Sequence, residues 1–115
     1  MKAILRKNGT LLLPIEFAAY ERMLVGNDSG QIALKIVPNE TIYTNVGSKL
    51  AFSSRFHKRP HVWLMPVLRQ LGLDVSDLAA ISGEYNLMEI EEGKYVFPLR
   101  ERSELKGYDL DGGIL

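Results

Sequence analysis

The chain opens with two short apolar segments on either side of an Asn-Gly pair. Residues 2–7 read KAILRK and residues 10–13 read TLLL, with Asn8-Gly9 between them. Asparagine and glycine both tolerate positive φ, which a type I′ turn requires at both central positions. This pattern therefore predicts a β-hairpin at the start of the chain.

Apolar positions after the hairpin follow a helical spacing. Pro14 suits the first position of a helix, and the apolar residues beyond it recur at intervals of three and four. We therefore expect a helix over 14–25, with a longer strand through Phe17 as the competing interpretation. The composition of residues 26–30, GNDSG, predicts a loop.

Alternating and β-branched residues then favour strands. QIALKIV alternates between apolar and other positions, which predicts a strand over 31–37. The β-branched and aromatic stretch Thr41–Val46 predicts a second strand, and Lys49–Ser53 a short further one.

A helix pair is expected next. Pro60 suits the start of a helix that ends at Gly72, and Pro66 within it should kink or restart the helix. Either Asp74 or Ser76 can cap a second short helix through Ile81.

A second hairpin is predicted near the end of the chain. YNLMEI at 85–90 and KYVFPL at 94–99 flank a short turn that contains Gly93. Pro98 indicates that the last strand is an edge strand or ends there. The tail, 101–115, is expected to be irregular.

Strands and helices do not alternate as βαβ units, so the order favours an α+β fold. We expect a single domain over 1–115, with an antiparallel sheet built from two β-hairpins plus central strands and packed by two or three helices. A chain of 115 residues with 46% apolar residues is long and apolar enough to form a core.

Composition excludes several kinds of site. The chain has no cysteine, which excludes disulfides, thiolate nucleophiles and cysteine zinc sites and fits a cytoplasmic protein. No apolar run approaches the roughly 20 residues that span a bilayer. Walker and dinucleotide glycine motifs are missing, so no cofactor is predicted.

Charge is segregated although the net charge is zero. Residues 41–70 contain five basic residues and no acid, whereas residues 71–93 contain six acids and no base. The two segments either pack together and neutralise each other or form a basic and an acidic surface.

The basic segment contains the candidate site. If Pro60 starts a helix, the preceding Arg59 is a poor cap, and free amides beside basic residues would bind an anion. Phe56 or Trp63 could stack a base or pack against a partner. The competing interpretation is that water or upstream serines satisfy the amides and that Trp63 belongs to the core. The predicted partner-binding residues are Arg55, Phe56, His57, Lys58, Arg59, His61 and Trp63.

Two stretches resemble nucleic-acid-binding families. Residues 67–82 are similar to a helix-turn-helix with Gly72 in the turn, but the second helix carries Asp77 and no basic residue. Residues 6–17, RKNGTLLLPIEF, resemble the start of AbrB-like swapped-hairpin transcription factors, with matches at Arg6, Gly9, 11–14 and Glu16. The second resemblance covers about a dozen residues, and the chain departs from it afterwards.

The favoured function is a small non-enzymatic binding or regulatory module that engages nucleic acid or an acidic protein face through segment 55–63. The first alternative is a protein-interaction or inhibitor module acting through sheet edges or the acidic segment 84–92. The second is a small enzyme using His57 or His61, although no nucleophile or metal set accompanies them. A homodimer that covers edge strands is a further expectation.

Overall fold

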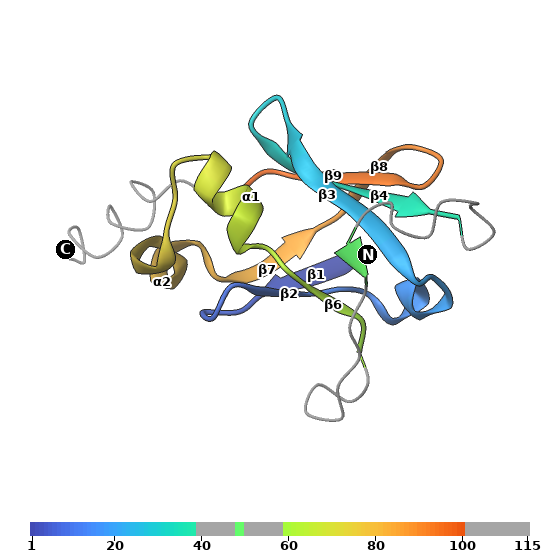
Figure 1. Ribbon diagram of the computed structural model, residues 1–115, viewed down its shortest axis with the longest axis horizontal. Helices are drawn as coiled ribbons and strands as arrows, with labels where there is room; N and C mark the ends of the chain where they lie inside the picture. The colour runs from blue at the N-terminus through green and yellow to red at the C-terminus, as the bar shows by residue number, and fades with distance from the viewer. Residues whose placement is uncertain (39–47, 50–58, 101–115) are drawn as a thin grey trace.

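A computed structural model describes residues 1–38, 48–49 and 59–100, with only the backbone described for residues 48 and 49. The chain forms two antiparallel sheets and short helices (Figure 1), which confirms the α+β class. The strand orders are β6-β2-β1-β7 in the four-stranded sheet and β5-β3-β4-β9-β8 in the five-stranded sheet. Two sheets thus take the place of the single sheet that was expected.

The four-stranded sheet joins the first hairpin to strands from the second half of the chain. The hairpin strand β1 pairs with β2, while β6 and β7 form the two outer edges. Thr10 lies opposite Trp63, and Ile4 lies opposite Glu84. Its strands are β1 (Lys2–Leu5), β2 (Thr10–Leu12), β6 (His61–Trp63) and β7 (Gly83–Asn86).

The five-stranded sheet is built from two hairpins and one short strand. The longest pairing joins β3 and β4 along their whole length, from Arg22 opposite Val37 to Asp28 opposite Gln31. Strand β9 adds to the other side of β4, and β8 forms the outer edge. The strands are β3 (Arg22–Asp28), β4 (Gln31–Val37), β5 (Ser48–Lys49), β8 (Met88–Glu91) and β9 (Lys94–Phe97).

One hydrophobic core lies between the two sheets. Alternate residues of the inner strands point inward, so Leu5 and Leu11 of one sheet and Leu34 and Phe97 of the other are all buried. Phe17 packs against Tyr95 with ring centroids 5.1 Å apart. Hydrophobic burial between the sheets therefore holds the two layers together.

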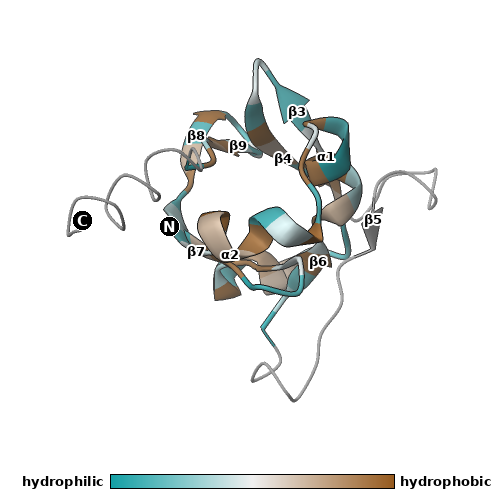
Figure 2. Cartoon of the chain, turned by 90° about the vertical axis from the view of Figure 1, so that its left-hand side faces the viewer, coloured by the Kyte–Doolittle hydropathy of each residue, from teal (hydrophilic) through white to brown (hydrophobic). Residues whose placement is uncertain are grey.

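Short helical segments lie at both ends of this core (Figure 1). The 3-10 turn η1 (Ile15–Ala19) at one end buries Phe17, and helix α1 (Met65–Gln70) at the other buries Met65, Val67 and Leu68. The 3-10 turn η3 (Val75–Asp77) continues directly into α2 (Leu78–Ile81). Figure 2 shows α1 and α2 together at one end of the two layers. In the described part of the chain, no helix is long and apolar enough to cross a membrane.

The first hairpin is confirmed, but its turn is not type I′. Only Gly9 has a positive φ, 91°, and its amide donates to the carbonyl of Arg6 at 3.0 Å. Oδ1 of Asn8 instead accepts a hydrogen bond from the Thr10 amide at 2.9 Å. This local bond favours a wider turn. A two-residue turn with positive φ at both positions occurs elsewhere, at Ser29-Gly30, between the paired ends of β3 and β4.

The predicted helix over 14–25 is wrong beyond its first turn. Helical structure ends at Ala19, and β3 begins at Arg22 and continues through the expected loop. Pairing with β4 along seven residues and burial of Met23 favour the extended conformation. Tertiary pairing has overridden a helical apolar spacing.

The helix predicted from Pro60 is also wrong at its start. Residues 61–63 form β6, and α1 begins only at Met65. Pro66 lies in the first turn, where its missing amide removes no helical hydrogen bond, so it causes no kink. The end was predicted correctly: Gly72 has a φ of 82°, and the Leu73 amide donates to the Leu68 carbonyl at 2.9 Å.

The remaining predictions are confirmed in part. Asp74 caps η3 by accepting the Ser76 amide at 2.9 Å. Strands β8 and β9 form the second hairpin, but residues 85–86 belong to β7 in the other sheet. Strand β9 ends directly before Pro98. The strand predicted over 41–46 and the tail lie outside the described residues, as does most of the predicted strand 49–53.

Candidate functional site: a basic and aromatic surface

The structure describes part of the predicted binding segment. Arg55, Phe56, His57 and Lys58 lie outside the described residues. The other predicted residues lie on β6 or just before it. Since β6 is a strand paired with β2, its amides do not form the helix start on which the predicted anion site depended.

Arg59 acts within the fold. Its Nε donates to the Leu13 carbonyl at 2.6 Å, and its Nη2 donates to the Lys2 carbonyl at 3.3 Å. Charge-assisted bonds of this kind are among the stronger hydrogen bonds of a protein. The guanidinium of Arg59 thus joins the backbone just before β6 to the first hairpin.

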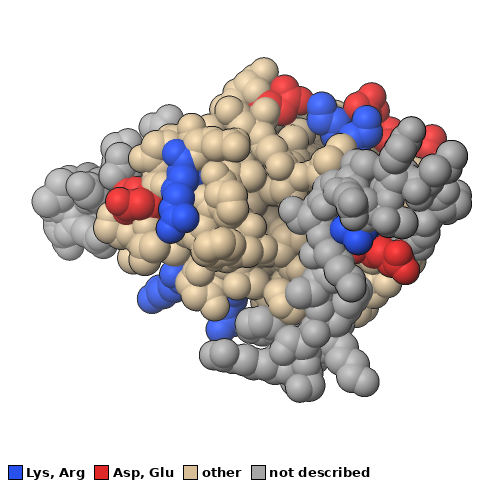
Figure 3. Space-filling model, viewed as in Figure 1, with Lys and Arg blue, Asp and Glu red and all other residues tan. Residues whose placement is uncertain are grey.

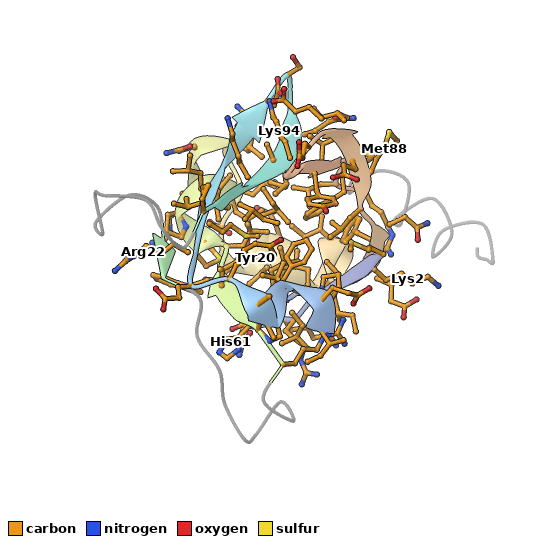
Figure 4. All side chains as sticks on the ribbon, turned by 90° about the vertical axis from the view of Figure 1, so that its right-hand side faces the viewer. Lys2, Tyr20, Arg22, His61, Met88 and Lys94 are labelled. Carbon is orange, nitrogen blue, oxygen red and sulfur yellow. The ribbon has the colours of Figure 1, made fainter. Side chains whose placement is uncertain are left out.

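His61 is half-buried on β6. Its Nδ1 lies 3.0 Å from the carbonyl oxygen of Arg59, and Figure 4 shows the side chain at the margin of the ribbon. In the described residues, no three histidine or acidic side chains are grouped so as to hold a metal ion.

Trp63 is exposed at the end of β6, where the competing interpretation expected a core residue. Its exposed fraction is 59%, which is high for the largest apolar side chain. The guanidinium carbon of Arg69 in α1 lies 5.9 Å from the centre of the indole, within the range of a cation–π contact. The indole is therefore held near a positive charge and open to solvent.

The turn of the first hairpin supports this tryptophan. The Leu64 amide donates to the Gly9 carbonyl at 2.8 Å, which docks the end of β6 on the turn. The packing is so close that a Cβ at Gly9 would lie 2.7 Å from Cγ of Met65 and 3.3 Å from Nε1 of Trp63. Glycine is needed here both for its positive φ and for this contact.

Two cations and a groove lie on the same turn. Arg6 and Lys7 are exposed. An open groove of about 410 Å³ separates the turn from the start of β7. Arg100 lies near this groove, but its guanidinium donates to the carbonyls of Ser82 and Glu84 at 2.9 and 2.7 Å. The groove is lined by Leu5, Arg6, Lys7, Asn8, Ser82 and Gly83.

Arg6, Lys7, Trp63 and Arg69 together form what we call the basic aromatic surface. In Figure 3, the half of the molecule that carries the helices shows blue side chains around a largely uncharged area, with red atoms beside one of them. Ion pairs join Lys2 to Glu84 and Lys94 to Asp28. The basic and acidic segments are thus not joined to each other by either pair.

Sequence reasoning found only one of the four residues of this surface. Trp63 was predicted, whereas Arg69 comes from the helix that follows β6, and Arg6 and Lys7 come from a hairpin turn that is remote in sequence. The Asn-Gly turn with two preceding cations was the available signal. Its proximity to Trp63 depends on the pairing of β2 with β6, which no sequence pattern specified.

The helix-turn-helix resemblance gains no support from the second helix. Helix α2 has four residues, and Asp77 before it is buried, with Oδ2 accepting the Asp74 amide at 2.8 Å. A recognition helix must present several side chains to base edges, which so short a helix does not do. The helices instead pack their apolar residues into the core.

Comparison of the chain with protein-family models, with curated proteins and with solved structures gave no match. The function is therefore argued from the geometry of the surface.

Proposed function

We propose that this protein is a small non-enzymatic binding module that engages an anionic partner through the basic aromatic surface. The observation that supports it best is the exposed indole of Trp63 between Arg69 and the basic turn. An exposed tryptophan next to cations suits a ligand that offers both a planar apolar group and negative charge.

Single-stranded nucleic acid has both properties in each nucleotide. A base can stack on the indole of Trp63, while the adjacent phosphates lie near Lys7 and Arg69. Base–aromatic stacking contributes about 1–3 kcal/mol per base and tolerates any sequence. An acidic protein face would satisfy the cations but leave the indole without a planar partner, so we favour nucleic acid.

The chain provides its own spectroscopic probe, because Trp63 is the only tryptophan. Addition of a single-stranded oligonucleotide of about twelve nucleotides should quench its fluorescence as a base stacks on the ring. Polyglutamate serves as the probe for an acidic protein partner. Affinity for the oligonucleotide should fall steeply with salt, with a log–log slope of about −0.7 for each phosphate contacted.

Charge reversal tests which side chains are involved. Lys7→Glu combined with Arg69→Glu should weaken oligonucleotide binding strongly, because both contacts become repulsive. Lys35→Glu is the matched control, since Lys35 is an exposed cation on the five-stranded sheet. Equal binding by the double variant and the native chain would contradict the proposal, as would a failure of the oligonucleotide to bind. Binding of polyglutamate alone would assign the partner to acidic proteins.

A further inference from the structure

Strand β8 exposes every residue it contains. Met88 is 59% exposed and Ile90 is 49% exposed, and the strand also carries Glu89 and Glu91. Figure 4 shows Met88 pointing away from the edge of the five-stranded sheet. Two large exposed apolar side chains on one short edge strand form an apolar surface of the kind that marks an interaction site.

The outer side of β8 is open in the part of the chain that the structure describes. Strand β8 pairs with β9 on one side, and no described strand lies on the other. The outer edge of β7 is different, because the guanidinium of Arg100 binds the carbonyls of Ser82 and Glu84 there. An open edge presents backbone donors and acceptors at the spacing of a further strand.

The side chains of β8 differ between its two faces. Met88 lies opposite Val96, which is itself 3% exposed but does not belong to the core cluster that contains Tyr95 and Phe97. Glu89 lies opposite Tyr95 on the other face. Burial of the Tyr95 hydroxyl is the main cause that raises its pKa, and the negative charge of Glu89 raises this pKa further. Ile90 lies where the register shifts between Glu89 and Glu91.

A strand added to β8 would meet these two faces alternately. On one face, a residue of the added strand would lie beside Met88, where an apolar side chain fits, and on the other face a residue would lie beside Glu89. The acidic turn residue Glu92 is also exposed next to the strand. Charge complementarity therefore favours a basic segment, and it disfavours pairing with β8 of a second copy, which would bring like charges together.

We infer that the edge of β8 binds an extended segment of a partner protein in which basic and apolar residues alternate. The segment adds as a further strand to the five-stranded sheet, with backbone hydrogen bonds to β8. Its apolar side chains cover Met88, and its basic side chains pair with Glu89 on the opposite face; Glu91, which lies opposite Lys94, is on the Met88 face. This inference does not depend on the basic aromatic surface.

The test uses a labelled peptide of about seven residues in which lysine alternates with isoleucine, measured by fluorescence anisotropy on the full chain. Met88→Lys should reduce its affinity about tenfold, through loss of apolar burial and through repulsion. Glu89→Lys should reduce it further. Val75→Lys is the matched control, because Val75 is equally apolar and 62% exposed but lies in η3. Circular dichroism and thermal unfolding check that each variant is folded.

Two control peptides separate strand addition from charge attraction alone. Replacement of lysine by glutamate should abolish binding, and methylation of alternate backbone nitrogens should do so as well, because it removes the donors. The inference is overturned if the methylated peptide binds equally well or if Met88→Lys and Val75→Lys have the same effect. It is also overturned if the chain is a dimer that Met88→Lys converts to a monomer, since β8 would then pair with a second copy.

Discussion

Trp63 and Met88 have the same exposed fraction, 59%, but their surroundings differ in charge and in backbone. Trp63 rests on a tight glycine turn with Arg69 nearby, so its side chain is presented on a backbone that is already paired. Met88 lies on an open edge among glutamates, so both its side chain and its backbone are available. The exposed fraction of an apolar side chain therefore does not define a binding surface by itself. The neighbouring charges and the backbone groups open to a partner define it.

The largest expected effect is on the turn that supports Trp63. Gly9→Ala should lower the free energy of unfolding by about 2–4 kcal/mol, because the residue has positive φ and its Cβ would clash with Met65. Gly30→Ala is the matched control: its φ is 84° and nothing lies near its Cβ, so a loss of only about 1 kcal/mol is expected. Urea unfolding of both variants measures the difference, and equal losses would show that the contact with Met65 contributes nothing.

Arg59 and Arg69 should differ although both belong to the basic segment. Arg59→Ala leaves the carbonyls of Leu13 and Lys2 without their donor, with an expected loss of about 1.5–3 kcal/mol. Arg69 is exposed, so Arg69→Ala should change the free energy of unfolding by less than about 0.5 kcal/mol. Denaturant unfolding tests this order. A stable Arg59→Ala variant with weakened oligonucleotide binding would return Arg59 to the binding surface.

Truncation of the two exposed side chains should separate the two surfaces. Trp63→Ala should weaken oligonucleotide binding about tenfold through lost stacking and leave the lysine–isoleucine peptide unaffected. Met88→Ala should do the opposite. Anisotropy with both ligands on both variants tests this. An equal loss of both ligands in either variant would indicate one shared surface and remove the basis of the comparison.

The smallest effect concerns the ion pair between Lys94 of β9 and Asp28 of β3, whose Nζ and Oδ2 atoms are 2.9 Å apart. The hydrogen bond and the charge of Lys94 lower the pKa of Asp28 below its ordinary value of 3.8. Stability from this carboxylate is therefore present above that value and is lost as pH falls through the lower pKa of the folded state. Asp28→Asn should flatten this acid limb slightly in unfolding measured between neutral and acid pH; an unchanged limb would mean that the pair contributes nothing.

Local patterns succeeded where the chain forms a structure with its own neighbours. The first hairpin, the strand over 31–37, the β8–β9 hairpin, the helix end at Gly72 and the cap at Asp74 all depend on contacts within a few residues. The candidate site was predicted less well. Trp63 was included for its possible stacking. Arg59 was assigned to binding as a cation beside an expected helix start, and its structural role was missed because its carbonyl partners lie 46 and 57 residues away.

The sequence by itself determined the α+β class, the separation of basic and acidic segments and several turns, because periodicity and turn chemistry act over short distances. Only the tertiary structure decided that residues 22–28 and 61–63 are strands, since pairing with β4 and β2 outweighs their local preferences. It also decided which charged residues remain exposed. Trp63 meets the basic turn because β6 pairs with β2, whereas no strand of the described residues pairs with the outer side of β8.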